Sequence, residues 1–239
     1  MEGLMLMKRV TKISLQYFES AEKYGSSNLK PIQLLRPETG KGKSVLSALK
    51  QRKTIREISD KKLPLQVLSN LIWSACGVNR KKGPFGLPGR TAATASNSQE
   101  IDLYVSMEEG IYSYDFFKHL LIPIVSGDFR SLAIGKGQSG FGNMAPVRLI
   151  YVADINRLVN TLGYQEPGLL NPEIQKSYYF VDTGIIAANV YLFASSHGLA
   201  AWFHNCNKPG LAAKLNLRAD QRVLFGQTVG YPVKKRSKK

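Results

Sequence analysis

The residues best suited to bind a charged ligand form one short basic cluster. It consists of Arg52, Lys53, Thr54, Ile55 and Arg56, so a hydroxyl stands among several cationic donors. Guanidinium groups and hydroxyls match the oxygens of a phosphate monoester in geometry and charge. Charge alone favours a solvated basic turn. The phosphate interpretation therefore depends on the motifs that accompany the cluster.

A second pattern has the glycine spacing of a dinucleotide-binding loop. It runs from Gly135 through Gly137 to Gly140, and Asp154 stands near the place of a ribose-binding acid. Such a loop must end an apolar strand and open a helix. Residues 128–134 before it are instead predicted to be helical, and the stretch from Gly140 to Pro146 is too short for the required helix. This context argues against a dinucleotide site.

Metal and nucleophile chemistry have little support in the sequence. His197, His204 and Cys206 have an H-x6-H-x-C spacing, but no fourth ligand and no second cysteine pair accompany them. No serine lies in a G-x-S-x-G turn, so an acyl-transfer triad has no starting point. We expect neither a metal site nor a catalytic side chain.

The formal net charge of +16 suggests a polyanionic partner, but its distribution weakens that interpretation. Residues 1–62 carry 14 basic and 6 acidic side chains, and the last six residues carry 5 basic and no acidic ones. Residues 63–233 carry 14 basic against 11 acidic side chains. The central body is therefore close to balanced, and a nucleic-acid-binding module remains an alternative driven by the chain ends. We expect no nucleic-acid partner.

Length and composition predict a protein with a substantial core. A chain of 239 residues with 44% apolar residues can fold without disulfides, and Cys76 and Cys206 lie far apart in apolar or aromatic surroundings. No signal-peptide run and no stretch of about 20 apolar residues is present in the given sequence. We expect a cytoplasmic protein with no membrane partner.

Periodicity and turn residues predict an N-terminal arm, residues 1–43, followed by one domain, residues 44–239. The arm is polar and rich in turns, and either wraps a partner or is loose. Beyond it, helices are predicted at 44–51, 64–75 and 181–197, strands at 102–107, 111–114, 147–153, 199–203 and 223–229, and an irregular glycine-rich loop at 82–90. The last helix is apolar around most of its circumference, which predicts a central, buried position.

The basic cluster resembles the R-x-S/T-x-R/K phosphate motif of nitroreductase-like flavoproteins. The other segments that match the family are Arg90 to Glu100, similar to R-T-x-P-S-x-x-N-x-Q, Ala145-Pro146-Val147 before a strand, Asp182 to Ala194 with Gly198-Leu199, and Val229 to Pro232. Each is weak alone, but together they follow the family's order. The hairpin at 109–115 looks most like the SagB-type branch, named for oxidases of peptide azoline rings.

The resemblance implies an α+β fold, an α/β sandwich in which a mixed, mainly antiparallel sheet is flanked by helices, and an intertwined homodimer that binds FMN. The implied cofactor-binding residues fall into four segments, and Ala93 replaces the family's proline in the second. These residues are Arg52, Lys53, Thr54 and Arg56, then Thr94, Ser96 and Asn97 from the partner subunit, then Trp202, Phe203, His204 and Asn205 near the flavin ring, and finally Lys235 and Arg236 in the basic tail.

The implied activity is reduction of FMN by NADH or NADPH, followed by electron transfer to a flat small-molecule acceptor such as a nitroaromatic or a quinone. The flavin carries the chemistry, and Trp202, Phe203 and the 83–89 loop are expected to line its pocket. Two alternatives keep the fold. One is a dehydrogenase or oxidase acting on a peptide-derived substrate, and the other uses bound flavin without redox turnover.

Overall fold

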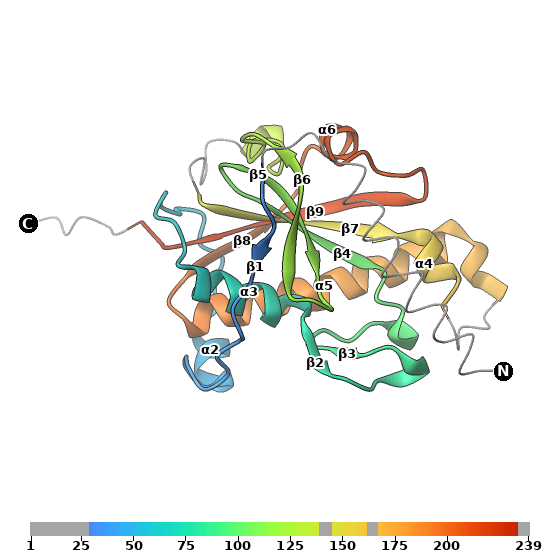
Figure 1. The fold of residues 1–239 in the computed structure, drawn as a ribbon, viewed down its shortest axis with the longest axis horizontal. Helices are drawn as coiled ribbons and strands as arrows, with labels where there is room; N and C mark the ends of the chain where they lie inside the picture. The colour runs from blue at the N-terminus through green and yellow to red at the C-terminus, as the bar shows by residue number, and fades with distance from the viewer. Residues whose placement is uncertain (1–28, 139–144, 162–166, 234–239) are drawn as a thin grey trace, which may run out of the picture.

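The computed structural model describes residues 29–138, 145–161 and 167–233, which form a central sheet with helices on both faces (Figure 1). Every pairing between its strands is antiparallel within the described residues. Across the sheet the strands are β1 (Ile32–Gln33), β6 (Leu120–Ser126), β5 (Gly110–Asp115), β4 (Ile101–Ser106), β7 (Val147–Asp154), β9 (Gln221–Gly230) and β8 (Ala200–His204). The expected α+β sandwich is confirmed.

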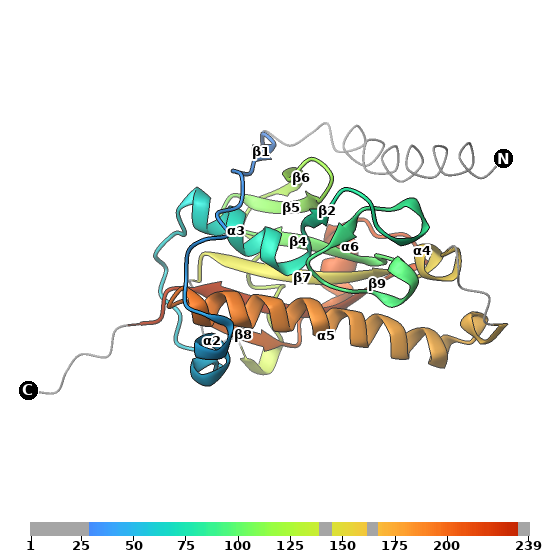
Figure 2. The same cartoon turned by 90° about the horizontal axis from the view of Figure 1, so that it is seen from below.

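Three helices cover one face of this sheet. They are α2 (Val45–Gln51), α3 (Leu65–Cys76) and α5 (Pro172–Ser196). Figure 2 shows α5 running along the whole sheet, with α2 beside its C-terminal end. The short α6 (Lys208–Lys214) lies on the opposite face, and α4 (Ile155–Val159) follows β7 directly (Figure 1). Among the described residues, no helix has the length and apolar character needed to cross a bilayer.

Local signals explain where these helices begin and end. The Ser44 side chain accepts a hydrogen bond from the Ser47 N–H (3.3 Å) and so caps α2 as predicted. Helix α3 begins after Pro64 and ends at Gly77, where an added Cβ would come within 2.4 Å of the Trp73 ring. Only glycine allows this close approach. Helix α5 begins at Pro172 rather than near 181, because Asn171 caps it.

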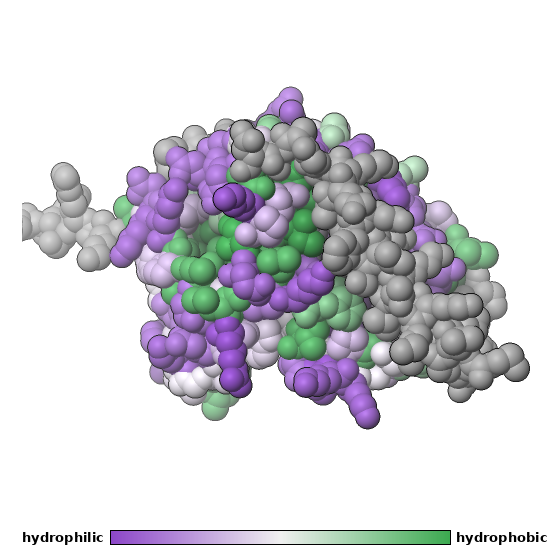
Figure 3. Space-filling view, viewed as in Figure 1, coloured by the Kyte–Doolittle hydropathy of each residue, from purple (hydrophilic) through white to green (hydrophobic). Residues whose placement is uncertain are grey.

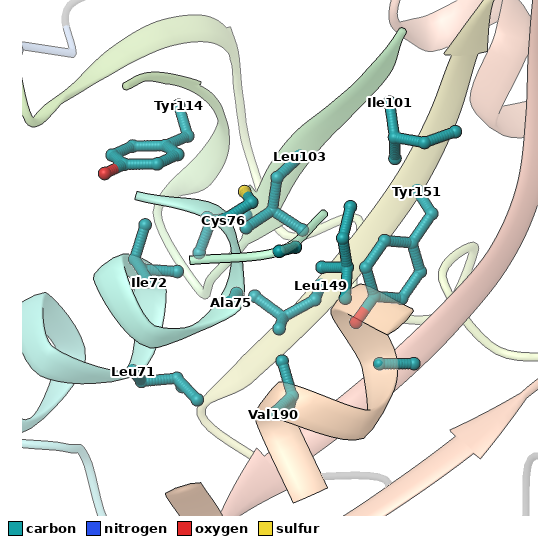
Figure 4. Packing of buried hydrophobic residues seen from close by; sticks show 14 of the residues in the cluster. Leu71, Ile72, Ala75, Cys76, Ile101, Leu103, Tyr114, Leu149, Tyr151 and Val190 are labelled. Atoms are coloured by element: carbon teal, nitrogen blue, oxygen red, sulfur yellow. The ribbon is translucent and has the colours of Figure 1, made fainter. Parts of the chain in front are cut away.

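The main core lies between the sheet and α3 and α5. Side chains from both helices meet the buried faces of β4, β5 and β7 (Figure 4). Helix α3 contributes Leu71 and Ile72, β7 contributes Leu149 and Tyr151, and α5 contributes Val190. A second apolar cluster packs under α6 on the opposite face. Strand β7 is consequently buried along its full length, which confirms its predicted central place.

Two sequence predictions are wrong. Residues 128–134 form turns instead of a helix, because the Asp128 carboxylate accepts from the Arg130 N–H and pairs with its guanidinium (2.6 Å). The glycine-rich loop is partly regular, since β2 (Val78–Arg80) pairs with β3 (Gly89–Arg90) around a 3-10 turn at Pro84–Gly86. This hairpin stands off the main sheet, below it in Figure 1.

The described part of the predicted arm, residues 29–43, lies against the body of its own chain. Strand β1 pairs with β6, and Leu34 is buried in the main core. The Leu34 N–H also donates to the His119 carbonyl (3.2 Å). Both cysteines are free and buried, so the expectation of no disulfide is confirmed for Cys76 and Cys206.

Candidate functional site

The basic cluster, residues 52–56, leaves α2 and runs along the exposed edge of β8. The Ile55 N–H donates to the Ala201 carbonyl (3.0 Å), which fixes the cluster to this strand. Arg52, Lys53 and Arg56 are exposed, and none of them forms an ion pair with any described residue. Three cations held together without an acidic partner form a surface suited to an anion.

Tyr191 of α5 joins the cluster to β8, a role that the sequence analysis did not predict. Its hydroxyl accepts from the Phe203 N–H (2.9 Å) and lies 3.1 Å from the Thr54 hydroxyl, to which it can donate. The Arg52 guanidinium lies over the Tyr191 ring, 5.5 Å from its centroid. A tyrosine in a mainly apolar stretch of the helix was the signal, because the hydroxyl of a partly buried tyrosine needs a hydrogen-bonding partner.

We expect Tyr191→Phe to lower the free energy of unfolding by about 1–2 kcal/mol, because the Phe203 N–H loses its acceptor. A urea titration of the purified protein measures this change. Tyr231→Phe is the matched control, since its ring keeps the contact with Lys61 (4.7 Å). Equal stability of Tyr191→Phe and the unaltered protein would show that the hydroxyl does not tie the cluster to β8.

The predicted flavin-ring segment, residues 202–205, alternates across the sheet. Trp202 and His204 point away from α5 and are buried, with their rings 4.6 Å apart. Phe203 is half-buried on the α5 side, and its ring packs at a tilt against that of Phe225, with the ring centroids 4.8 Å apart. Asn205 is exposed just beyond the strand. Phe203 and Asn205 are thus open to a ligand, whereas the Trp202 side chain belongs to the core and does not line an open pocket of this protomer.

His204 is held as a neutral imidazole. Its Nδ1 donates to the Asn205 carbonyl (2.8 Å), and its Nε2 accepts from the Thr228 hydroxyl (2.8 Å). Burial, with a smaller contribution from the nearby Arg148, lowers the pKa of His204 to about 4, although the hydrogen bond to the Asn205 carbonyl acts in the opposite direction. Because both ring nitrogens are engaged, the His204 side chain is not available as a flavin or metal ligand.

The remaining predicted residues, Thr94, Ser96 and Asn97, lie in a strained turn. Ser96 and Asn97 have φ values of 48° and 53°, and Gln99 has a φ of 54°, so three non-glycine residues are left-handed. The Gln99 N–H donates to the Thr94 hydroxyl (3.1 Å), while the Asn97 amide donates to the Pro84 carbonyl (3.1 Å). Strain held by so many bonds is typical of functional loops.

The Asn97 side chain is engaged inside this loop on both sides. Its Oδ1 accepts from the Gln99 side-chain amide (2.8 Å), in addition to the bond that its Nδ2 donates to Pro84. This arrangement fixes the turn to the β2–β3 hairpin, so the Asn97 side chain acts within the loop. The turn backbone and the Ser96 hydroxyl are the groups left to face a ligand.

The basic cluster and the 94–97 turn contact α5 at different positions along the helix axis. The Asp182 carboxylate accepts from the Ala95 N–H (3.2 Å), whereas Tyr191 contacts Thr54. Positions 182 and 191 are about 14 Å apart along a helix that rises 1.5 Å per residue. One protomer therefore does not bring the basic cluster and the 94–97 turn together.

Exposed apolar and small side chains lie along α5 and on α2, and together they form what we name the apolar helix surface. It comprises Val45, Leu46 and Leu49 of α2 and Val181, Gly184 and Ala188 of α5. Leu46 is 79% exposed and Val181 is 60% exposed. Large apolar side chains that are exposed together mark an interaction surface.

Two cavities lie away from both groups. One of about 420 Å³ is lined by residues near β1, the start of α3 and Arg130, and Figure 3 shows apolar residues in a hollow on this face with hydrophilic residues around it. The other, of about 270 Å³, lies between α2, α3 and α5. Neither is lined by the basic cluster or by the 94–97 turn.

The predicted tail ligands, Lys235 and Arg236, lie outside the described residues. The last described residue, Val233, donates its N–H to the Glu57 carbonyl (3.0 Å), so the chain leaves the body beside the basic cluster. In the glycine pattern at 135–140, Lys136–Gln138 is a 3-10 turn, and Ser139 and Gly140 lie outside the described residues. Asp154 caps α4 and pairs with Arg218 (2.7 Å), which gives it a structural role.

Known proteins share this fold. The chain is 31% identical to a candidate nitroreductase of Ralstonia eutropha, whose crystal structure covers 87% of this chain and 92% of its own with a TM-score of 0.73. A candidate nitroreductase of Methanocaldococcus jannaschii is 29% identical over 156 residues, which is 62% of this chain and 72% of that protein.

A structure from Parabacteroides distasonis, titled as a candidate NADH dehydrogenase/NAD(P)H nitroreductase, shares the fold at 14% identity. It covers 80% of this chain and 89% of its own, with a TM-score of 0.52. The sequence profile of the nitroreductase family matches residues 49–231, from the end of α2 to the end of β9. The chain belongs to the nitroreductase family.

Proposed function

We propose that this protein is an FMN-dependent oxidoreductase that takes hydride from NADH or NADPH and reduces a flat organic acceptor, such as a nitroaromatic or a quinone. Its family supports oxidoreductase activity. The observation that carries the flavin assignment is the basic cluster, whose three exposed cations have no acidic partner among the described residues and are tied through Tyr191 to β8.

The residues present fit FMN. Arg52, Lys53 and Arg56 would hold the phosphate, and the Thr54 hydroxyl would reach the phosphate or the ribityl chain. Phe203 and the exposed Asn205 would border the ring, which supplies the hydride-accepting chemistry when it is bound. The Phe203 ring packs against the Phe225 ring at a tilt of 45°, and this aromatic pair would help to exclude water from this side of the ring. Lys235 and Arg236 stay predicted phosphate contacts.

The second half of the site is proposed to come from a partner subunit. The midpoint between Asp182 and Tyr191 falls at position 186–187 of α5, and the exposed Gly184 and Ala188 lie on either side of it. Two copies of α5 crossing there antiparallel would place Asp182 of each copy opposite Tyr191 of the other. The 94–97 turn of one protomer would then face the basic cluster of its partner.

The electron donor is proposed from the chemistry of the site and from similar proteins. The name of the Parabacteroides distasonis structure includes both NADH and NAD(P)H, and that protein shares only the fold. A nicotinamide dinucleotide carries phosphates, and Arg80, Lys81 and Lys82 at the tip of the β2–β3 hairpin are exposed. The stretch from Cys76 to Gln99 contains no acidic residue to oppose such a ligand.

We expect Phe203→Ala to change the ratio of rates with a nitroaromatic and with a quinone at least several-fold while FMN remains bound. The half-buried ring borders the proposed acceptor pocket, whereas the phosphate contacts lie in the basic cluster. Steady-state rates with the two acceptors, together with the flavin-to-protein ratio, provide the measurement. An unchanged ratio of rates would remove Phe203 from the acceptor pocket.

An absorption spectrum of the purified protein, followed by anaerobic addition of NADH and then NADPH, tests the proposed function. Flavin bands that bleach with one donor support the proposal and identify that donor. A yellow protein that never bleaches would show a flavin-binding fold without this turnover. Colourless protein that takes up no added FMN would contradict the proposal, and a salt-dependent assay for nucleic-acid binding would then be the next experiment.

A further inference from the structure

Two buried carboxyl groups lie against each other behind the 94–97 turn. Glu100 is fully buried just before β4, and Asp182 of α5 is 3% exposed. The Asp182 carboxyl accepts from the Ala95 N–H (3.2 Å), and it lies near enough to the Glu100 carboxyl for the charge of that group to act on it. The Glu100 Oε2 atom accepts from the Ser98 hydroxyl (2.5 Å).

This pair needs a proton between its members. Two ionised carboxylates are both acceptors, and the Glu100 Oε1 atom is buried with no donor from the described residues. Burial and the negative charge of Glu100 raise the pKa of Asp182 to about 8. A proton on one carboxyl supplies the missing donor and removes one buried charge.

No cation neutralises the pair from the neighbouring elements that the structure describes. Arg157 of α4 donates to the Glu100 backbone carbonyl (3.2 Å), but its ion pair is with Asp102 of β4 (2.7 Å). The Asp154 carboxylate forms an ion pair with Arg218 (2.7 Å). On α5, burial raises the pKa of Tyr179, one turn before Asp182, so this phenol stays neutral.

The pair is connected directly to the strained turn. The Asp182 carboxyl accepts from the Ala95 N–H, and the Glu100 carboxyl accepts from the Ser98 hydroxyl. These two hydrogen bonds hold the residues on either side of Ser96 and Asn97. The left-handed conformations of these residues cost about 1–2 kcal/mol each and persist only while the surroundings impose them. When both carboxylates are ionised, they repel each other, and this repulsion strains the hydrogen bonds that hold Ala95 and Ser98.

We propose that Asp182 and Glu100 are positioning residues whose shared proton holds the 94–97 turn in its flavin-contacting shape, so that loss of this proton weakens FMN binding. This inference rests on the proposed FMN site, and it adds a regulation by pH that the family assignment does not contain. One proton linked to binding near pH 8 corresponds to a rise of about tenfold in the dissociation constant between pH 7 and pH 9.

The first experiment measures the FMN dissociation constant of the full chain by flavin fluorescence quenching from pH 6.5 to 9.5. In the unaltered protein, the FMN dissociation constant should rise with pH. In Asp182→Asn it should not rise, because an amide both donates to Glu100 and accepts from Ala95, as the protonated acid does. Glu100→Gln should also lose the dependence, and it serves where Asp182→Asn does not fold. Asp60→Asn, which removes an exposed carboxylate, should keep the rise.

A measurement without flavin separates this inference from the proposed function. An unfolded Asp has a pKa of about 3.9, so the folded protein retains a proton that the unfolded chain loses. The contribution of this proton to the free energy of unfolding is fully present in acid, falls as the pH rises toward 8, and stays constant above pH 8. The thermal midpoint of the apoprotein should therefore fall less between pH 6 and 8 in Asp182→Asn than in the unaltered chain.

The outcomes are distinct. Parallel pH profiles of the unaltered protein and Asp182→Asn, in FMN affinity or in apoprotein stability, would overturn the shared proton. Absence of FMN binding at every pH in every variant would overturn the proposed function, and the apoprotein profile would still decide whether the pair shares a proton.

Discussion

Gly184→Glu should produce a stable, colourless monomer. A Cβ added at Gly184 meets no atom of its own protomer within 4 Å, so the substitution fits the isolated chain. It should strengthen α5, because glycine in a helix interior is about 1 kcal/mol less favourable than alanine and glutamate is among the good helix formers. Across the proposed twofold axis, however, the new carboxylate would meet its own copy and the partner helix, and both FMN sites would lose their second half.

Sedimentation velocity and the flavin-to-protein ratio measure this result together with the thermal midpoint. Gly184→Ala is the matched control, since it gives the same helical gain with little bulk and should remain dimeric and yellow. A dimeric, FMN-loaded Gly184→Glu would show that the apolar helix surface is not the interface. A variant that is monomeric yet still holds FMN would show that one protomer suffices for the cofactor.

Combined replacement of Arg52 and Arg56 by glutamine should weaken FMN binding by at least about 100-fold. Each charge-assisted contact to a phosphate contributes about 1.5–3 kcal/mol, which corresponds to roughly 10- to 100-fold in Kd. The fold should persist, because both side chains are exposed and their described contacts are ring stackings on Tyr191 and Trp202. Titration of the apoprotein with FMN gives the affinity.

Riboflavin, which lacks the phosphate, provides the internal comparison for this double variant. Its affinity should change far less than that of FMN. Lys30→Gln is the control for a general loss of positive charge, because Lys30 is exposed beside β1, at the sheet edge opposite β8. If Lys30→Gln weakened FMN binding equally, the cluster would act only through the net charge of the protein.

The elements that the sequence predicted correctly have strong local signals. Capping by Ser44 and a glycine after α3 fix the ends of two helices, and the alternation on either side of 108–110 predicts the β4–β5 hairpin. The continuous apolar run of β7 reflects its burial on both faces. In each case, the residues within or next to the element determine where it ends or how deeply it is buried.

Elements whose stability comes from tertiary contacts were missed. Strand β6 contains Pro123, which cannot donate to a neighbouring strand, and the ladder tolerates it at an irregular register opposite Tyr112. Strand β1 has only two residues, and α6 contains Pro209 and Gly210, which are typical of loops. Asn207 nevertheless caps α6 by accepting from the Gly210 N–H (3.1 Å).

The residues of the candidate site likewise include some that local sequence predicts and others that it does not. The basic cluster could be recognised because its residue types match a phosphate at close sequence spacing. Tyr191 and Asp182 could not, since their roles depend on partners 137 residues away at Thr54 and 87 residues away at Ala95. Their polarity in an apolar helix was the only local sign. The burial of Trp202 and His204 likewise follows from the direction of β8 within the sheet, which no local pattern predicts.

The pairing of the 55–59 stretch with the end of the chain has a consequence for synthesis of the protein. Ile55 bonds to Ala201, Ser59 to Tyr231, and Glu57 to Val233, so the basic cluster is placed by residues that are made long after it. Such contacts between distant parts of a chain form slowly. Under the proposed function, a nascent chain on the ribosome is therefore unable to take up FMN until β8 and β9 have emerged.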